Sequence, residues 1–255
     1  MIVAISIVVL IYGCKPQEEQ EVTTSVAYSS DSLPSRWSNS SIFPIHLNIS
    51  NDFNQDESVA ITNAANSWTL DEQKSSSDFF TTSSENIDNK DNLASYEDNL
   101  FGIYKVYNWP ESLPGTALAV TQINGLQKSS YIEITHADIL LNYDFFSFTT
   151  DSSWGYDLQT VLVHEMGHFL GLYHESSSLE ESVMYPTISR YHDNHAPKQN
   201  DKEKLASKYG LTIRGQANQA IKLPNSNEMG TPITIQLELY PDTREIIRIN
   251  GKIQK

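Results

Sequence analysis

The chain has 255 residues, which is enough for one sizeable domain with extensions and for a core that can hold a rigid site. It contains 17 Lys and Arg against 32 Asp and Glu, and its formal net charge of −15 opposes electrostatic binding to nucleic acid or to an anionic membrane surface. We expect no nucleic-acid partner and attribute the acidity to solubility, with Ca2+ binding as an alternative that no motif supports.

Residues 1–12 are almost entirely apolar and are followed by Gly13 and Cys14. The run is too short to span a bilayer as a structural helix, and residues 1–14 resemble a bacterial lipoprotein signal with Cys14 as the lipidated first residue. Because no Lys or Arg precedes the run, a plain secretory signal or a buried N-terminal strand stays open. Cys14 is the only cysteine, so the chain contains no disulfide. We expect a protein of the cell envelope, anchored to the membrane by lipid or secreted, that faces outside the cytoplasm.

The composition changes twice before the folded part begins. Residues 15–39 are rich in Ser, Thr, Gln and Glu and poor in large apolar residues, which is typical of a disordered tether. The main domain is expected over residues 40–212. It opens with a strand at 42–49 that has one alternating apolar face, and a helix over 57–70 follows. The residues expected to face inward on this helix are Val59, Ala60, Ala64 and Trp68.

A long polar segment separates this helix from the next strands. Residues 71–99 contain only Phe79 and Phe80 as a large apolar pair and exceed the length of a normal connection, so we expect a partly mobile surface insertion. The strands expected after it lie at 101–107, 115–123 and 131–141.

The strongest signal in the chain is the run HEMGHFLGLYH, residues 164–174. Residues four apart on a helix lie one above the other, so His164 and His168 can direct their rings at a single point. Glu165 lies beside that point, close enough to take a proton from water at a metal but not placed as a ligand. This spacing predicts two metal ligands and a general base, whereas a core helix with incidental histidines is the competing interpretation.

The ends of this helix are also marked in the sequence. Asp157 can cap its first turn, and we expect the helix over about residues 157–170. Gly171 permits the positive φ that turns the chain back, so His174 arrives from the following loop as a third ligand. Three protein ligands leave a fourth position for water, which is the arrangement of catalytic rather than structural zinc.

The motif His-Glu-x-x-His-x-x-Gly-x-x-His followed by a methionine turn is the signature of metzincin peptidases, and residues 182–186, SVMYP, resemble that turn. The segments at 156–159 and 170–172, together with Met184-Tyr185-Pro186, are similar to matrixins, including their bacterial members. Residues 200–210 resemble the matrixin closing helix, with Asn200 and Glu203 as its capping pair and Gly210 at its end. The resemblance extends over roughly residues 36–211 and is dense in motifs only from Tyr156 onward.

The resemblance implies an α+β fold with a twisted mixed sheet, an active-site helix, a Met-turn and a closing C-terminal helix. It implies one catalytic Zn2+ bound by His164, His168 and His174, with Met184 as a structural residue beneath the imidazoles. By the same resemblance, the strand at 115–123 is the edge strand above the zinc, to which a protein or peptide substrate adds in extended form.

Three features depart from the matrixin pattern. Glu175 follows the third histidine where matrixins usually carry Ser, which is more like astacins. Astacins and serralysins place a Tyr two residues after the turn methionine, but Pro186 stands there, so Tyr185 is not assigned to catalysis. The cysteine-switch propeptide of the family is missing, and we expect no latency by a thiolate on zinc.

The other histidines have weaker claims to a metal. His136 with Asp138 could belong to a second, structural metal site, although no further ligands are evident. His192 and His195 more plausibly belong to an exposed loop that walls the specificity pocket, with a metal as the alternative. His46 on the first strand is expected to be a partly buried polar tip.

Residues 213–255 form a C-terminal extension. Its segments 234–240 and 244–249 alternate around Pro241-Asp242-Thr243, which predicts a hairpin that either packs on the domain or forms a separate appendage.

These observations predict a monomeric zinc-dependent endopeptidase that hydrolyses peptide bonds in extended protein segments, with Glu165 as its catalytic residue. One alternative is a non-catalytic, zinc-stabilised cell-surface binding module. Another is a cell-surface scaffold that acts through residues 71–99 and the C-terminal hairpin. Glu165 argues against a purely structural zinc site, which would not need this carboxylate and would fill its fourth position with protein.

Overall fold

The computed structural model describes residues 33–242 except 39, 72, 74, 75, 152, 153, 177, 179, 191 and 214–227. The expected signal at 1–14, most of the tether at 15–39 and the second arm of the hairpin at 244–249 therefore lie outside the described residues. Within the described part, no helix has both the length and the apolar character needed to cross a membrane.

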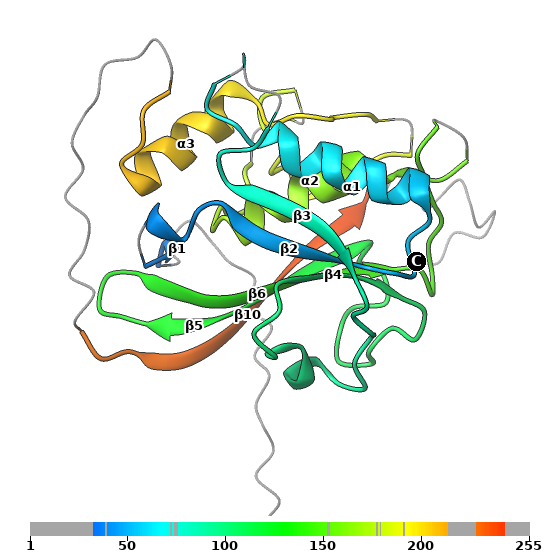
Figure 1. Ribbon diagram of the computed structural model, residues 1–255, viewed down its shortest axis with the longest axis horizontal. Helices are drawn as coiled ribbons and strands as arrows, with labels where there is room; N and C mark the ends of the chain where they lie inside the picture. The colour runs from blue at the N-terminus through cyan, green and yellow to red at the C-terminus, as the bar shows by residue number, and fades with distance from the viewer. Residues whose placement is uncertain are drawn as a thin grey trace, which may run out of the picture.

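A mixed sheet of eight strands lies beneath three α-helices (Figure 1). Its order is β3-β2-β4-β6-β5-β10-β9, and β1 pairs with the start of β6. The strands are β1 Ser35–Trp37, β2 Ile45–Ser50, β3 Phe80–Glu85, β4 Gly102–Val106, β5 Ala119–Gln127, β6 Ile132–Asn142, β9 Thr187–Ile188 and β10 Thr231–Pro241. The α-helices are α1 Gln55–Ser67, α2 Leu158–Phe169 and α3 Gln199–Tyr209. The remaining elements are the short helices η1 Ser40–Ile42 and η2 Leu93–Tyr96 and the strand pair β7 Phe148–Thr149 and β8 Tyr156–Asp157. This architecture agrees with the predicted α+β class.

The strand directions divide the sheet into two parts. Strands β3, β2, β4 and β6 run parallel to one another, and the short β1 runs parallel to β6. Strand β5 is antiparallel to both β6 and β10, and β10 is parallel to β9. The antiparallel part lies next to α2, so this region of the sheet forms one side of the candidate site.

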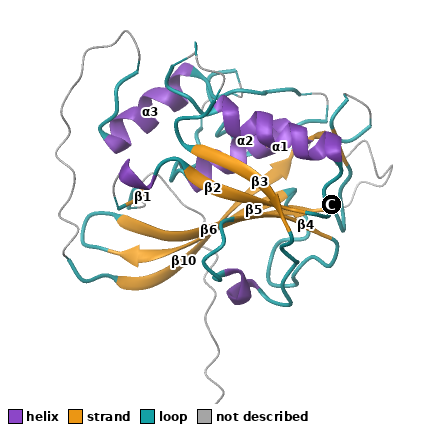
Figure 2. Cartoon of the chain, viewed as in Figure 1, coloured by secondary structure: helices purple, strands orange, loops and turns teal. Residues whose placement is uncertain are grey.

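Alternation along the strands builds a core on each face of the sheet. Ile103, Ile139 and Ala119 belong to the larger core, which also contains the buried side chains of α1 and α2. Tyr104 and Val120, each one residue further along, belong to a smaller core on the opposite face, near η2 (Figure 2). Because both faces are covered, the central strands are buried along most of their length and give α2 a rigid support.

Helix α1 begins two residues before its predicted start, and Asn54 caps it. The Asn54 side chain accepts a hydrogen bond from the Glu57 N–H at 2.9 Å, while the Glu57 carboxylate accepts one from the Asn54 N–H at 2.8 Å. Ala60 and Ala64 face inward as predicted, but the prediction for Val59 was wrong, because its side chain is 47% exposed. The buried positions of α1 are Glu57, Ala60, Ile61, Ala64 and Ala65, a helical stripe that excludes Val59.

Helix α2 agrees with its predicted bounds to within one residue at each end. Asp157 caps it by accepting a hydrogen bond from the Thr160 N–H at 2.7 Å. At the other end Gly171 has a φ of 82°, and the residue that packs against it is Ser35 of β1. A side chain at this position would be strained and would collide with the Ser35 carbonyl, so glycine is required where the chain turns toward His174.

The predicted closing helix exists as α3, but its predicted capping pair was wrong. The helix begins at Gln199, and the Lys198 N–H donates a hydrogen bond to the buried carboxylate of Asp201 at 2.9 Å. Asn200 therefore lies inside the first turn and cannot be the cap. Gly210 ends the helix with a φ of 62°, as predicted.

The range expected to be a surface insertion contains an unpredicted strand of the sheet. β3 pairs in parallel with β2, and Phe79 and Phe80 are 0% and 2% exposed. The two phenylalanines that stood out in a polar stretch are the residues that attach this segment to the core.

The predicted edge strand is not an edge in this fold. β5 has β6 on one side and β10 on the other, and β10 pairs with it from Thr231↔Gln127 to Leu239↔Ala119. The expectation was wrong because the first arm of the predicted hairpin packs on the domain and pairs with the backbone groups that β5 would otherwise expose.

The His136 ring is held by hydrogen-bond contacts to Asp138 and to the Tyr96 backbone. Its Nε2 lies 2.8 Å from Asp138 Oδ2 and 2.8 Å from the Tyr96 carbonyl oxygen. Burial by itself lowers the pKa of His136, but the hydrogen bond and the charge of Asp138 raise the pKa overall. This contact accounts for His136 and Asp138 without a metal, and within the described ranges only residues 164, 168 and 174 form a group of three side chains that could hold a metal ion.

This pair predicts a pH dependence of stability. A histidine whose pKa is raised by folding stabilises the folded state fully below its unfolded pKa of about 6.5, and the contribution is lost as the pH rises through the folded value. We expect the difference in free energy of unfolding between the wild type and His136→Gln to be larger at pH 6 than at pH 9, as measured by urea denaturation. An equal difference at both pH values would contradict a charged His136.

Candidate metal centre

Three imidazoles converge at the C-terminal part of α2. His164 and His168 lie one helical turn apart, and His174 arrives from the loop after Gly171. One nitrogen of each ring lies within 4.8 Å of the other two, and the Nε2 atoms of His168 and His174 are 3.1 Å apart. The structure thus brings together all three residues that the sequence predicted as ligands.

The opposite ring nitrogens are held by backbone carbonyls. His164 Nδ1 lies 2.7 Å from the Val183 carbonyl oxygen, and His168 Nδ1 lies 2.7 Å from that of Leu172. A carbonyl can only accept, so each Nδ1 carries the proton and each Nε2 is left with a free lone pair. These contacts fix both the tautomer and the direction of the rings, which is how outer contacts orient metal ligands.

The environment also keeps the rings neutral. Burial lowers the pKa of His164 to about 3 and that of His174 to about 4, and it lowers the pKa of His168 well below its ordinary range. Neutral imidazole is the form that binds a metal ion.

These residues fit a zinc ion. His164 Nε2 is buried without a hydrogen-bond partner among the described residues, an arrangement that costs free energy unless something binds it. Tetrahedral zinc with bonds of about 2.0–2.1 Å to nitrogen places two ligand nitrogens about 3.4 Å apart, close to the His168–His174 separation. His168 Nε2 cannot donate a hydrogen bond to His174, because its proton is on Nδ1, so it presents a lone pair at this point.

Glu165 lies next to the imidazoles and is fully buried. Its Oε2 accepts a hydrogen bond from the Thr121 hydroxyl of β5 at 2.5 Å, and its Oε1 has no partner in the described part of the chain. Burial raises the pKa of Glu165 to about 8, despite the opposing effect of the Thr121 hydrogen bond. A carboxylate in this state is prepared to accept a proton near neutral pH.

Met184 packs directly beneath this part of α2. A Cβ built on Gly167 would lie 2.3 Å from Met184 Sδ and 3.1 Å from the ring of Trp68. Met184 is 1% exposed, so its thioether fills the space that glycine leaves open between the two ligands of the helix.

A buried carboxylate on α3 holds the segment before Met184. Asp201 accepts hydrogen bonds from the Ser182 hydroxyl at 2.6 Å and from the Val183 N–H at 3.0 Å. The carbonyl of Val183 in turn accepts from His164 Nδ1. The position of the His164 ring therefore depends on the carboxylate of Asp201, which lies 37 positions further along the sequence (201 − 164).

Removing this carboxylate should weaken metal binding without removing a ligand. Loss of an outer contact typically lowers metal affinity by about 10- to 100-fold, and we expect Asp201→Ala to weaken zinc binding by that amount. Competition with a zinc-binding dye measures the effect. Asp193→Ala, which removes an exposed carboxylate, is the matched control and should leave the affinity unchanged.

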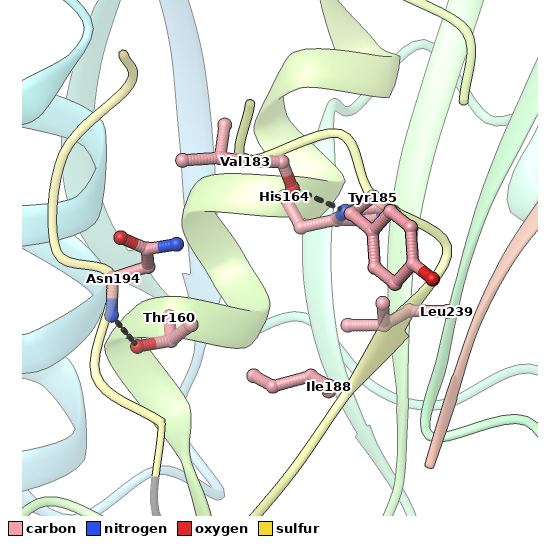
Figure 3. Close-up of a pocket in the computed structure, with 7 residues that line it drawn as sticks. All are labelled: Thr160, His164, Val183, Tyr185, Ile188, Asn194 and Leu239. Atoms are coloured by element: carbon pink, nitrogen blue, oxygen red, sulfur yellow. Dashed lines mark hydrogen bonds between the residues drawn. The ribbon is translucent and has the colours of Figure 1, made fainter. Parts of the chain in front are cut away.

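A small, mainly apolar pocket opens beside His164 (Figure 3). It lies between α2, the segment after Met184 and strand β10. Its lining residues are Thr160, His164, Val183, Tyr185, Ile188, Asn194 and Leu239. Three of these residues, Tyr185, Ile188 and Asn194, come from the segment after the Met184 turn that was expected to wall a specificity pocket, and Leu239 is an addition that the sequence did not indicate.

The remaining sequence candidates lie outside the cluster. Glu175 forms an ion pair with Lys204 of α3 at 2.5 Å, so the residue that departs from the matrixin pattern links the third-ligand loop to that helix. His195 is half exposed and pairs with Asp157 at 2.9 Å. His46 is exposed rather than partly buried, and it contacts the hydroxyls of Thr81 and Ser83 on β3.

Sequence reasoning did not find Thr121, Asp201 or Leu239. Each approaches the centre from an element that is remote in sequence, and none belongs to a recognisable motif. Asp201 offered the one usable signal, because a carboxylate in the first turn of a helix often accepts hydrogen bonds there.

The fold and the three histidines on α2 and the loop after it define an α+β domain of the metzincin type with a candidate metal centre. The chain matches the family model of the matrixins, peptidase family M10, over residues 45–210, and it belongs to this family. It is also 67% identical over 33 residues to Metalloendoproteinase 2-MMP of Arabidopsis thaliana, a match that covers 13% of this chain and 8% of that protein. The chain therefore matches far less than two thirds of that relative's length.

Proposed function

We propose that this protein is a zinc-dependent endopeptidase that hydrolyses peptide bonds in extended protein segments. The observation that carries the proposal is the convergence of three neutral imidazoles beside a fully buried glutamate whose pKa is raised to about 8. Membership of the matrixin family and the similarity to a metalloendoproteinase support the same activity.

The residues have separate roles in this mechanism. His164, His168 and His174 would bind one zinc ion through Nε2. When bound, zinc lowers the pKa of a coordinated water and polarises the scissile carbonyl. Glu165 accepts a proton from water and later delivers it to the leaving amine, so no covalent acyl-enzyme forms. Thr121 positions Glu165 through the hydrogen bond to Oε2 and leaves Oε1 available for proton transfer.

The raised pKa of Glu165 bears on the alternative of a non-catalytic binding module. A structural zinc site has no use for a buried carboxylate that is kept next to the metal at a cost in desolvation. The neighbouring pocket also has a mainly apolar lining, which suits an apolar side chain of a peptide.

Digestion of a fluorogenic peptide library with and without a zinc chelator tests the function. We expect cleavage that is lost on chelation and restored by added Zn2+. Zinc binding without any cleavage, in the wild type and also in a Leu239→Asp variant, would instead favour the binding module.

We further propose that Cys14 carries a lipid and that the residues between Cys14 and β1 tether the domain to the outer side of a membrane. The expected tether at 15–39 is thereby shortened, because Ser35–Trp37 pair with β6 and belong to the sheet. The apolar run before Gly13-Cys14 supports this location. Two or more acyl chains give stable anchoring, whereas one does not. Mass spectrometry of the membrane-bound protein tests the modification, and Cys14→Ser should move the protein to the soluble fraction.

A further inference from the structure

Strand β10 lies between the two backbone segments that border the metal centre. It is antiparallel to β5, whose Thr121 holds Glu165, and parallel to β9, which follows the Met184 turn. The Leu239 carbonyl accepts a hydrogen bond from the Leu118 N–H at 2.8 Å, and the Tyr240 N–H donates to the Pro186 carbonyl at 3.1 Å. These are the backbone groups that an extended peptide would use to add to the sheet.

The side chain of Leu239 forms part of the pocket beside His164. Leu239 is 1% exposed, and it lines the pocket next to Tyr185 (Figure 3). The next inward residues on the strand, Leu237 and Ile235, are 3% and 1% exposed. Recognition of an extended peptide combines two elements: backbone pairing with neighbouring strands and a side chain inserted into a pocket. Strand β10 has both, because it pairs with β5 and β9 and places Leu239 in the pocket beside His164.

The register places β10 next to the residue that holds Glu165. Leu237 lies opposite Thr121, and Glu238 and Leu239 follow it opposite Val120 and Ala119. Carbonyls alternate in direction along a strand, and the Leu239 carbonyl points to β5. The Glu238 carbonyl therefore points away from β5, toward the side on which β10 pairs with β9.

We propose that residues Thr231–Asp242 occupy the peptide-binding cleft in the manner of a substrate and exclude other extended peptides from it. The inference rests on the proposed function only in naming the excluded peptides as substrates. Because the strand belongs to the same chain, its effective concentration at the cleft exceeds that of a free peptide, so it holds the protein latent until it is displaced.

Binding to a catalytically silent chain tests the occupancy. A fluorescent peptide with the sequence of residues 231–242 is titrated into full-length, zinc-loaded Glu165→Ala and into the double variant Glu165→Ala/Leu239→Asp, and its anisotropy is followed. Burying a leucine is worth roughly 10- to 100-fold in an equilibrium constant, so we expect at least about tenfold tighter binding to the double variant. Equal affinity for both proteins, whether tight or undetectable, would overturn the proposal.

A milder pair of variants controls for general loosening of the fold. Leu239→Ala and Leu205→Ala remove the same group from buried sites, but Leu205 is on α3 and outside the pocket. In the Glu165→Ala background, only Leu239→Ala should bind the peptide more tightly than the parent. A similar gain from Leu205→Ala would mean that destabilisation alone opens the cleft, and the proposal would be wrong.

An activity measurement separates this inference from the proposed function. With Glu165 intact, Leu239→Asp should raise kcat/KM for a fluorogenic peptide by at least about tenfold over the wild type. A gain in peptide binding with no cleavage by either protein would reject the peptidase and keep the occupied cleft. Equal cleavage by both proteins with no gain in binding would keep the peptidase and reject the occupied cleft.

Discussion

Glu165→Ala should abolish nearly all peptide cleavage while leaving zinc binding intact. The carboxylate is the proposed proton acceptor and donor, and general acid–base catalysis contributes about 10²- to 10⁴-fold to a rate. We expect kcat to fall by at least that range with KM little changed. The effect is measured as cleavage of one fluorogenic peptide. Glu165→Ala is compared with the wild type, and Glu165→Ala/Leu239→Asp is compared with Leu239→Asp.

The metal content separates a catalytic defect from a damaged site. Glu165 is not a ligand, so elemental analysis should find one zinc per chain before and after the substitution. Glu175→Ala is a matched control, because it removes a nearby carboxylate that pairs with Lys204 and does not reach the centre. Retention of full activity by Glu165→Ala would refute its role as the general base.

The second large effect is expected from His168→Ala, which should lose the metal. His168 is 0% exposed, its ring is oriented by the Leu172 carbonyl, and its Nε2 lies 3.1 Å from that of His174. Removing one of three ligands should weaken zinc binding by more than the roughly 10- to 100-fold loss typical of an outer contact. Elemental analysis of dialysed protein should find far less than one zinc per chain.

Loss of the metal should also appear as loss of stability. A ligand present at about 100 times its dissociation constant stabilises the folded state by about 2.7 kcal/mol. A chelator should therefore lower the melting temperature of the wild type and leave that of His168→Ala unchanged. His195→Ala removes an imidazole outside the cluster and should respond to the chelator like the wild type. A chelator response in His168→Ala equal to that of the wild type would rule out His168 as a ligand.

Local sequence was sufficient to predict the parts of the site that belong to helix α2 and its two ends. The four-residue spacing of His164 and His168 sets their relation on α2, Asp157 caps the helix, and Gly171 turns the chain toward His174. Each of these predictions depends on helical geometry and on the backbone freedom of glycine, which act over a few residues.

The predictions that were wrong depended on pairing or packing across the chain. Val59, Ala60 and Ile61 are consecutive apolar residues of α1, and only the packing of the helix against α2 and β3 decides which of them are buried. The start of α3 is decided by Asp201, whose carboxylate also binds the Ser182–Val183 segment. The resemblance placed β5 at the edge of the sheet, but its second side is covered by a strand more than 100 residues later (231 − 119).

The sequence by itself determined which three imidazoles form the candidate metal centre and which carboxylate is their neighbour, because those residues lie on one helix or on the loop that follows. Only the tertiary structure decided that Thr121 holds Glu165, that Asp201 fixes the backbone segment behind His164, and that Leu239 lines the pocket. These contacts join segments that meet only when the sheet has formed, and a hydroxyl, a carboxylate or a leucine carries no local sign of the partner it will find.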